Sequence, residues 1–392
     1  MTTFNLVFEG GGAKGLVLIG ALQTLIGQGH TPGRLLGTSA GAITATLLAA
    51  GYTADEIFDF AIEKVEDENG DQKARFATFL DEPAFNDDDI KESFIFKLFT
   101  SIDIPLVPTE AEVKDNALFG LLKSINVNLT EEELTFKILQ TLLGKDRFRH
   151  LFSFVEKGGL YAGQAFTDWL TEKLTAKGFG TATLAEMYAQ TGRDLTVIAS
   201  NTTREEMMAL NHRTAPDCPV VWAVRMSMSI PFLWQEVRWQ EDWGLYHGLD
   251  IKGSTIVDGG VLSNFPIRLL TSNDTDVVAL MDERTDSDMT LGLLIDETLP
   301  VENCGEQETG SLLERLPPII RIHRLVDTMA HARDNSAIKH YEKAVCHLPA
   351  QGYSTTEFDM PDHRIEALIT AGQVAMQKFL LTLANPPEID PN

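Results

Sequence analysis

Cysteine is scarce in this sequence. The 392 residues include only three cysteines, at positions 218, 304 and 346, and no two of them have the close spacing of a metal-binding pair. Cysteines so few and so widely separated argue against a disulfide framework. They favour a reducing compartment as the place where the protein works.

Positive charge is also in short supply. The chain carries 32 lysines and arginines against 57 aspartates and glutamates, which gives a formal net charge of −25. This balance argues against a nucleic-acid partner, because nothing in the chain would neutralise a phosphate backbone. A strongly anionic membrane surface would repel the chain on average, although a local patch could still dock.

Long hydrophobic runs and metal-ligand spacings are missing as well. The longest apolar stretch, residues 35–51, is rich in alanine, threonine and glycine and is too short for a convincing membrane span. A first strand that begins at Phe4 leaves no room for a cleaved secretory signal. We therefore expect a cytoplasmic protein that contacts membranes only peripherally, with export by a route without such a signal as the alternative. The nine histidines show no ligand spacing beside a carboxylate, so we expect neither a metal nor a cofactor.

What the chain does have is the composition of a globular α/β protein. Hydrophobic residues make up 44% of it and charged residues 23%. Its first fifty residues predict a strand at 5–8, a helix at 13–28, a strand at 34–37 and a helix at 39–50, which is the start of an α/β sheet. The later elements predicted are strands at 195–199, 255–257, 277–281 and 343–347 and helices at 164–177, 219–228, 312–333 and 363–383.

A long segment between these elements has a different pattern. Residues 66–159 alternate acidic runs with bulky apolar clusters, such as those at 94–99 and 102–107. Thr130 and Glu133 predict a capping box in front of a helix. We expect a helical insertion that acts either as a lid or membrane-docking element or as a subdomain packed on the core.

The first candidate site is the glycine loop that follows the first strand. Gly10, Gly12 and Gly15 satisfy G-x-G-x-x-G, the spacing of a dinucleotide-binding turn. A Rossmann unit would need an acidic residue about twenty residues further on, yet no Asp or Glu lies between residues 9 and 55. A phosphate-binding P-loop fails too, because glycine and leucine follow Lys14. The N–H groups of the loop, at a helix N-terminus, still suit an anion.

The second candidate site is Gly37-Thr38-Ser39-Ala40-Gly41, which matches G-x-S-x-G. This pattern forms the turn between a strand and a helix that exposes a serine hydroxyl at the helix N-terminus. If the first two strands are neighbours, both loops leave the same edge of the sheet, and the N–H groups of Gly11, Gly12 and Ala13 face Ser39. The anion that the glycine loop holds is then the oxyanion of a tetrahedral acyl intermediate.

A nucleophilic serine needs a base, and the sequence offers two kinds. An α/β-hydrolase would supply an acidic residue and then a histidine after the serine. In that fold, however, several strands normally precede the turn that carries the serine, whereas here only one strand precedes it. The alternative is Asp258, a carboxylate at the end of a strand and directly before Gly259 and Gly260. Asp258 would take the hydroxyl proton of Ser39 without a histidine, and His247 is the rival nearest to it in sequence.

Four blocks of the chain occur in an order that is typical of one family. They are Glu9-Gly10-Gly11-Gly12-Ala13-Lys14-Gly15, Gly37-Thr38-Ser39-Ala40-Gly41, Ser227-Met228-Ser229-Ile230-Pro231, and Asp258-Gly259-Gly260 followed by Asn264-Phe265-Pro266. With these blocks the chain resembles the patatin-like phospholipases, which are related to the cytosolic acyl hydrolases with a Ser–Asp dyad. The order and spacing fit the family from residue 4 to about residue 281.

The resemblance implies a fold and a set of site residues. The fold is a three-layer α/β sandwich with a mainly parallel central sheet, formed by residues 1–384 with residues 66–159 inserted, and residues 385–392 are expected to form a flexible tail. Ser39 is the implied nucleophile and Asp258 the implied base. The implied oxyanion donors are the N–H groups of Gly11, Gly12 and Ala13. The implied supporting residues are Gly10, Lys14, Gly15, Gly37, Gly41, Gly259 and Gly260.

The resemblance also implies an activity, the hydrolysis of acyl esters in lipids, with phospholipids as the first expected substrates. The reaction would pass through an acyl-enzyme on Ser39 with Asp258 as general base. A thioesterase or a neutral lipase on the same two residues is the alternative among enzymes. The alternative outside enzymes is a lipid- or partner-binding module with a vestigial dyad. The implied partner is a lipid substrate in transient contact with a membrane or micelle; an activating protein is left open, and no nucleic acid is expected.

Overall fold

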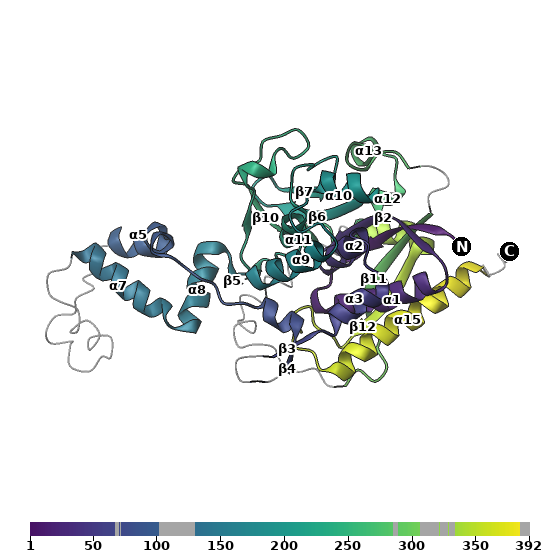
Figure 1. The fold of residues 1–392 in the computed structure, drawn as a ribbon, viewed down its shortest axis with the longest axis horizontal. Coiled ribbons are helices and arrows are strands. Elements are labelled where there is room, and N and C mark those ends of the chain that lie inside the picture. The colour runs from purple at the N-terminus through teal and green to yellow at the C-terminus, as the bar shows by residue number, and fades with distance from the viewer. Residues whose placement is uncertain are drawn as a thin grey trace. The chain divides into compact units, whose positions relative to one another are not determined.

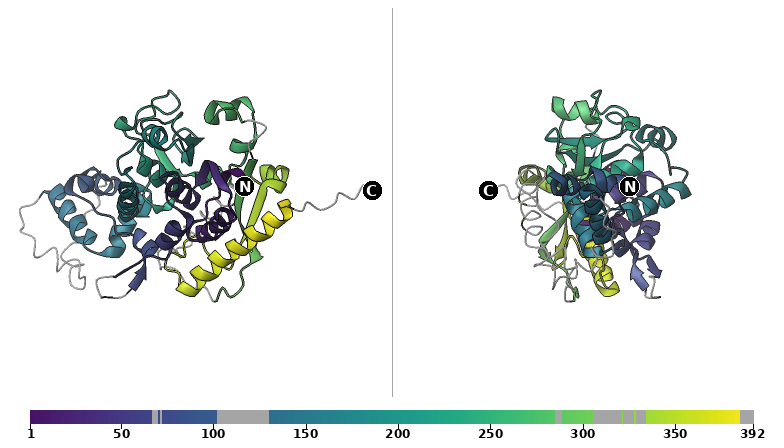
Figure 2. Two further views of the ribbon diagram at one scale, coloured as in Figure 1. Left: turned by 45° about the vertical axis from the view of Figure 1, so that its right-hand side comes forward. Right: turned by 90° about the vertical axis from the view of Figure 1, so that its left-hand side faces the viewer.

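The computed structural model describes residues 1–66, 70, 72–101, 130–284, 289–305, 321, 328 and 334–384. The chain divides into two compact units, which are drawn in Figures 1 and 2. The first, here called the α/β unit, consists of residues Met1–Leu80 and the chain from Gly163 onward. The second, here called the helical unit, consists of Asp81–Ala162.

The α/β unit is organised around a mixed sheet in which parallel strands predominate (Figure 1). In spatial order its strands are β12 (Val345–Gln351), β11 (Met289–Pro300), β1 (Thr3–Phe8), β2 (Thr31–Thr38), β6 (Leu195–Asn201), β10 (Thr255–Asp258) and β9 (Val237–Arg238). The strands from β12 to β6 pair in parallel. β10 and β7 (Glu206–Leu210) pair antiparallel with β6, and β9 pairs antiparallel with β10. The predicted α/β fold with a mainly parallel sheet is confirmed.

Helices cover both faces of this sheet, which explains why the central strands β1 and β6 are buried along almost their whole length (Figure 2). Every residue of β6 is buried, and so is every residue of β1 after the first. On one face the segment 265–281 packs on Val7, Leu36 and Ile198. The helices of the α/β unit are α1 (Leu16–Gly27), α2 (Ala40–Ala49), α3 (Ala54–Ala61), α9 (Gln164–Ala176), α10 (Leu184–Thr191), α11 (Val220–Ser227), α12 (Arg268–Thr271), α13 (Thr275–Met281) and α15 (Asp362–Ala384). Its remaining strands are β3 (Lys64–Glu66), β4 (Gln72–Ala74) and β8 (Phe232–Trp234).

The long helix α15 packs along α1. By length and composition α15 could cross a membrane. The two helices nevertheless approach at backbone distance, because a Cβ added to Gly20 would lie 1.9 Å from the carbonyl oxygen of Ile369, and one added to Gly372 would lie 2.1 Å from that of Val17. A contact this close identifies α15 as a core helix of the α/β unit.

The helical unit has its own small core. It contains α4 (Asp87–Glu92), α5 (Phe94–Ser101), α7 (Glu131–Leu143), α8 (Asp146–Lys157) and the short strand β5 (Gly159–Tyr161). Ile90, Leu139 and Phe152 are buried together in it. The capping box predicted at Thr130 and Glu133 is present at the start of α7. The apolar cluster at 102–107 lies outside the described residues.

Several sequence predictions differ from the structure or lie beyond the described residues. The strand predicted at 277–281 is wrong, because these residues end α13; Asp276 lies in its first turn, and the buried Val277 and Met281 are four residues apart on one helix face. The strand predicted at 343–347 begins two residues later, at Val345. The helix predicted at 312–333, apart from residues 321 and 328, and the tail at 385–392 lie outside the described residues.

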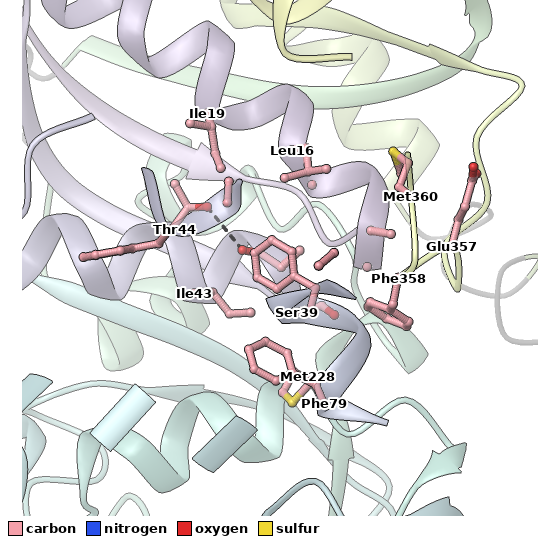
Figure 3. A pocket seen from close by; sticks show the side chains of 18 of the residues that line it. Leu16, Ile19, Ser39, Ile43, Thr44, Phe79, Met228, Glu357, Phe358 and Met360 are labelled. Atoms are coloured by element: carbon pink, nitrogen blue, oxygen red, sulfur yellow. Dashed lines mark hydrogen bonds between the residues drawn. The ribbon is translucent and has the colours of Figure 1, made fainter. Parts of the chain in front are cut away.

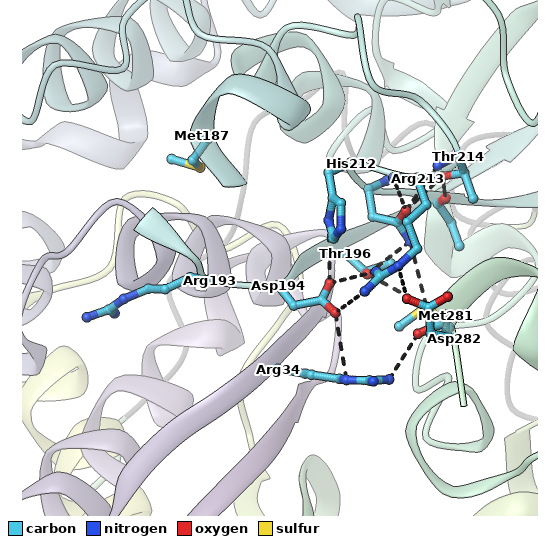
Figure 4. Close-up of polar contacts among 12 residues, drawn as sticks. Arg34, Met187, Arg193, Asp194, Thr196, His212, Arg213, Thr214, Met281 and Asp282 are labelled. Atoms are coloured by element: carbon cyan, nitrogen blue, oxygen red, sulfur yellow. Dashed lines mark hydrogen bonds and ion pairs between the residues drawn. The ribbon is translucent and has the colours of Figure 1, made fainter. Parts of the chain in front are cut away.

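A polar cluster fixes the edge of the sheet where β2 and β6 begin (Figure 4). Asp194, directly before β6, accepts hydrogen bonds from both Nη atoms of Arg213 at 3.1 and 2.9 Å and lies 3.7 Å from Nε of Arg34. Burial lowers the pKa of the neighbouring His212, and the Arg213 charge lowers it further. Ser39 follows the opposite end of β2, so this cluster stabilises the sheet away from the candidate site.

Candidate active site

Ser39 and the glycine loop, residues 9–15, leave neighbouring parallel strands at the same edge of the sheet. β1 pairs in parallel with β2, and Phe8 lies opposite Gly37. The glycine loop begins directly after Phe8, and Ser39 comes two residues after Gly37. The adjacency on which the sequence prediction depended is therefore present.

Asp258 reaches the same level along the same edge of β6, because β7 occupies the other edge over Val197–Asn201. Thr38, the last residue of β2, pairs with Ile198, but β6 continues to Asn201. β10 pairs antiparallel with this extension and ends with Asp258 opposite Ala199. β2 and β10 therefore meet end to end along this edge of β6, where Ser39 directly follows β2 and Asp258 ends β10.

The turn at Ser39 holds the serine in a strained backbone conformation. Ser39 has φ 50° and ψ −121°, in the left-handed region that favours glycine, and it precedes the first residue of α2. Its N–H donates to Oγ of Ser227 at 2.9 Å, which fixes the turn from α11. A Cβ on Gly41 would lie 2.3 Å from the carbonyl oxygen of Phe8, so only glycine lets α2 start this close to β1.

Asp258 is a buried carboxyl of which one oxygen is hydrogen-bonded to the backbone. Oδ1 accepts the N–H of Gly260 at 2.7 Å, and the Asp258 N–H donates to the carbonyl of Ser229 at 2.9 Å. Burial raises the pKa of Asp258 to about 7, while the Ser39 hydroxyl and the Gly260 N–H act to lower it. The side chains of Asp258 and Ser39 do not meet the criteria for an ordinary hydrogen bond. Oδ2 of Asp258 has no hydrogen-bond partner among the described residues.

The glycine loop presents two free donors and one that is engaged. The N–H groups of Gly11 and Gly12 make no hydrogen bond to the described part of the chain, whereas that of Ala13 donates to the carbonyl of Thr355 at 2.9 Å. Gly12 has φ +54°, and a Cβ there would lie 2.2 Å from the same Thr355 oxygen. Of the three predicted oxyanion donors, Ala13 is thus unavailable in this arrangement.

Glu9 and Lys14 hold the two ends of the loop. Glu9 accepts from Nδ2 of Asn264 at 3.1 Å and from the N–H of Ile295, and burial raises its pKa to about 8. The Lys14 ammonium pairs with Glu297 of β11. Lys14, one of the implied supporting residues, therefore fixes the loop through a side-chain ion pair. The other predicted supporting residues are close by: Gly10 and Gly15 in the loop, Gly37 and Gly41 on either side of Ser39, and Gly259 and Gly260 after Asp258.

Two pockets meet at Ser39. One, here called the apolar pocket, has a volume of about 850 Å³ with its open mouth included and is lined mainly by aliphatic and aromatic side chains. Figure 3 shows its wall built from α1 (Leu16, Ile19), α2 (Ile43, Thr44), Phe79, Met228 and the segment from Glu357 to Met360. The other, here called the polar pocket, is lined by the glycine loop, Asp258, Asn264, Glu297 and Thr355. Gly12, Ser39 and Ile230 line both pockets.

No histidine among the described residues lines either pocket. His247, the nearest rival in sequence, lies in a loop where its N–H donates to the carbonyl of Thr214. The described residues also contain no group of three His, Cys, Asp or Glu that could hold a metal ion. The site as described therefore brings together a serine, a carboxyl and two free N–H donors.

Several residues of the site were not assigned a role from the sequence. Ser227 stood in a motif block, and only the fold shows that its hydroxyl accepts the Ser39 N–H. Met228 and Trp234 line the apolar pocket, which the sequence could not separate from core positions. Nothing in the sequence indicated a role for Thr355 or Phe358, because they belong to no motif and reach the site through tertiary packing.

Comparison with known proteins gives one family. Residues 6–271 match the family model described as patatin-like phospholipase. The chain is 30% identical over 389 residues to the uncharacterized protein YqhO of Bacillus subtilis (strain 168). The alignment covers 95% of this chain and 97% of YqhO. It is 22% identical to "Probable lipid hydrolase 463L" of Invertebrate iridescent virus 6, over 67% of this chain and 61% of the viral protein. The structure of VipD from Legionella pneumophila aligns with a TM-score of 0.43 and 17% identity over 97% of this chain and 67% of VipD.

Proposed function

The chain belongs to the patatin-like phospholipase family, and on that premise we propose that it hydrolyses carboxylic esters of lipids, phospholipids before others, through an acyl-enzyme on Ser39. The observation that carries this proposal is the meeting of an apolar and a polar pocket at Ser39. An ester bond joins an acyl chain to a polar alcohol, so its two halves match the two pockets on either side of the serine.

The proposed reaction runs in two steps on the same residues. In the first, Oγ of Ser39 attacks the ester carbon while Asp258 takes the hydroxyl proton, and the N–H groups of Gly11 and Gly12 stabilise the oxyanion. The intermediate then expels the alcohol, which takes the proton from Asp258. In the second step Asp258 accepts a proton from water as the water attacks the acyl carbon, and release of the fatty acid returns the proton to Ser39.

The experiment that tests this function is product analysis on a mixed lipid extract. Wild-type protein is expected to release fatty acid and lysophospholipid, seen by mass spectrometry, and Ser39→Ala is expected to release neither. Free fatty acid with diacylglycerol would identify a neutral lipase, and activity confined to acyl thioesters would identify a thioesterase. An unchanged extract under conditions where short-chain esters are also not cleaved would favour the binding-module alternative.

We further propose that the helical unit docks on the lipid surface. Phe94, Leu98 and Phe99 of α5 are 61%, 37% and 38% exposed, although the same helix contributes Ile95 and Phe96 to the core of the unit. Apolar side chains on the outer face of a helix are suited to the interface of a membrane or micelle. Such transient contact fits a protein that works in the cytoplasm, where its three cysteines, free in the structure, would stay reduced.

Replacing Phe94, Leu98 and Phe99 together by Ser is expected to lower the rate on phospholipid vesicles by about tenfold or more, because apolar area that would enter the lipid is lost. The rate on a soluble short-chain ester is expected to stay the same. The matched control replaces three exposed apolar residues of α15, Val374, Leu381 and Leu383, by Ser. Equal rates of the α5 variant and the control on vesicles would show that α5 is only the surface of a subdomain.

A further inference from the structure

A segment near the end of the chain forms a wall of the site. The residues Tyr353–Met360, here called the wall segment, lie between β12 and α15, beyond residue 271 where the family match ends. Thr355 lines the polar pocket, and Glu357, Phe358 and Met360 line the apolar pocket (Figure 3). The wall segment is thus in contact with both halves of the proposed substrate site.

The wall segment is fastened by a fully buried arginine. Arg364 of α15 has no exposed side-chain surface, and its guanidinium binds both carboxylate oxygens of Glu357, at 2.6 and 3.1 Å. It also donates to the carbonyls of Cys304 and Gly352, at 2.6 and 2.8 Å. The Tyr353 ring stacks on the guanidinium, with the Arg364 Cζ 4.2 Å from the ring centre. These contacts tie Tyr353 and Glu357, two residues of the wall segment, to α15.

One end of the wall segment contacts the glycine loop. The carbonyl of Thr355 accepts the N–H of Ala13 at 2.9 Å. The same oxygen lies 2.2 Å from the place that a Cβ on Gly12 would take. Anything that moves the wall segment therefore moves the loop that carries the free Gly11 and Gly12 donors.

The other end limits the space for an acyl chain. The rings of Phe358 and Trp234 meet edge to face with their centres 5.3 Å apart, and both line the apolar pocket together with the buried Met360. Trp234 is itself fixed, because its Nε1 donates to the carbonyl of Phe79 at 3.0 Å. Phe358 is half-buried, so its ring is the member of this pair that faces open space in the pocket.

We propose that the wall segment determines which acyl chains the site accepts, with Phe358 as the specificity-determining residue and the Glu357–Arg364 pair as the group that positions it. This inference rests on the proposed function, because it assigns the apolar pocket to the acyl chain. It extends that function to a part of the chain that lies outside the family match.

The test compares acyl-chain selectivity in two variants, one with a smaller and one with a larger side chain at position 358. The wild-type, Phe358→Ala and Phe358→Trp proteins are compared on p-nitrophenyl esters from butyrate to palmitate, as the ratio of kcat/KM for the long ester to that for the short one. Phe358→Ala enlarges the pocket and is expected to raise this ratio by at least about fourfold, the factor that corresponds to one buried methylene. Phe358→Trp fills the pocket and is expected to lower it by a similar factor. Thermal unfolding shows which variants are folded, and either of them alone is informative.

Two controls separate this role from general damage. Tyr188→Ala removes a half-exposed aromatic ring that stacks on His212 away from both pockets, and it is expected to leave the ratio unchanged. Glu357→Gln keeps the shape but removes the charge that holds Arg364, and it is expected to raise the ratio toward that of Phe358→Ala. A wild-type protein that cleaves the esters while both Phe358 variants keep its ratio would overturn the proposal. A wild-type protein that cleaves none of the esters would instead count against the proposed function.

Discussion

Ser39→Gly is expected to abolish turnover and, at the same time, to give a more stable fold than Ser39→Ala. Both variants lose the nucleophile, so a fluorophosphonate probe that labels the wild-type serine should label neither, and hydrolysis should fall by at least about a thousandfold. They differ in strain, because alanine keeps a Cβ at φ 50° and glycine does not. Relief of a left-handed non-glycine residue is worth about 1–3 kcal/mol.

His247→Gly is the matched control for this prediction. His247 has φ 49°, nearly that of Ser39, but lies in an exposed loop outside both pockets. Its replacement by glycine is expected to relieve similar strain and to leave turnover intact. Urea unfolding measures the stabilities, and peptide mapping locates the probe. Labelling of a different serine, with Ser39 unmodified, would show that the nucleophile has been misassigned.

Asp258→Asn is expected to lower turnover by about 10²–10⁴-fold, the usual contribution of a general base. Asparagine has nearly the same shape and can still accept the N–H of Gly260, so the turn should be kept. What it lacks is the ability to take the proton of Ser39. If Asp258→Asn retained the wild-type rate while a stable histidine variant were inactive, a histidine would be the base.

The pH dependence of this reaction follows from the burial of Asp258. An aspartate in water titrates near pH 3.9, but burial raises the pKa of Asp258 to about 7. Since the base must be ionised, kcat/KM is expected to fall about tenfold per pH unit below that value. A histidine base would give a similar acid limb near pH 6.5. Because both bases give an acid limb near neutral pH, the Asp258→Asn and histidine variants are the measurement that distinguishes the dyad from a triad.

The same pKa shift has a second, thermodynamic signature. A folded-state pKa raised above the unfolded value means that the folded protein binds the proton more tightly. Asp258 thus contributes stability that is fully present below about pH 4 and is lost as the pH rises to about 7. Asp258→Asn removes this dependence, so its thermal midpoint should exceed that of the wild type at and above neutral pH. Calorimetry across this range measures the effect, and a wild-type midpoint that did not fall with rising pH relative to the variant would contradict it.

The sequence predicts the parts of the site that arise from local turns. Glycines at fixed distances from Ser39 and Asp258 are needed where backbones approach closely, and these distances are visible in the chain itself. The residues that come from tertiary packing are not visible in that way. Thr355 contacts Ala13 across more than three hundred residues of sequence, and Phe358 lies in no motif.

The fold could be predicted only in part for a similar physical reason. β1 and β2 are followed by recognisable loops and helices, whereas β11 has no such flanking signal and was not predicted. Its centre, Leu291 to Ile295, is buried on both faces, and a short run of this kind cannot be told from a buried helix by its periodicity. The run at 277–281 shows the converse error, since it is a helix that reads as a strand.

The position of β1 in the sheet sets the order in which the protein can become active during its synthesis. β1 is made first, yet one of its two neighbours in the sheet, β11, begins only at Met289. The carbonyl oxygen that accepts the N–H of Ala13 in the glycine loop belongs to Thr355. Contacts between such distant parts of a chain form late, because the intervening loop must close before they add stability. A ribosome-bound chain that already carries Ser39 and Asp258 therefore still lacks a completed sheet and a fixed glycine loop. If the chain hydrolyses lipids as proposed, this order of assembly keeps it inactive until the segment that carries Thr355 has been made.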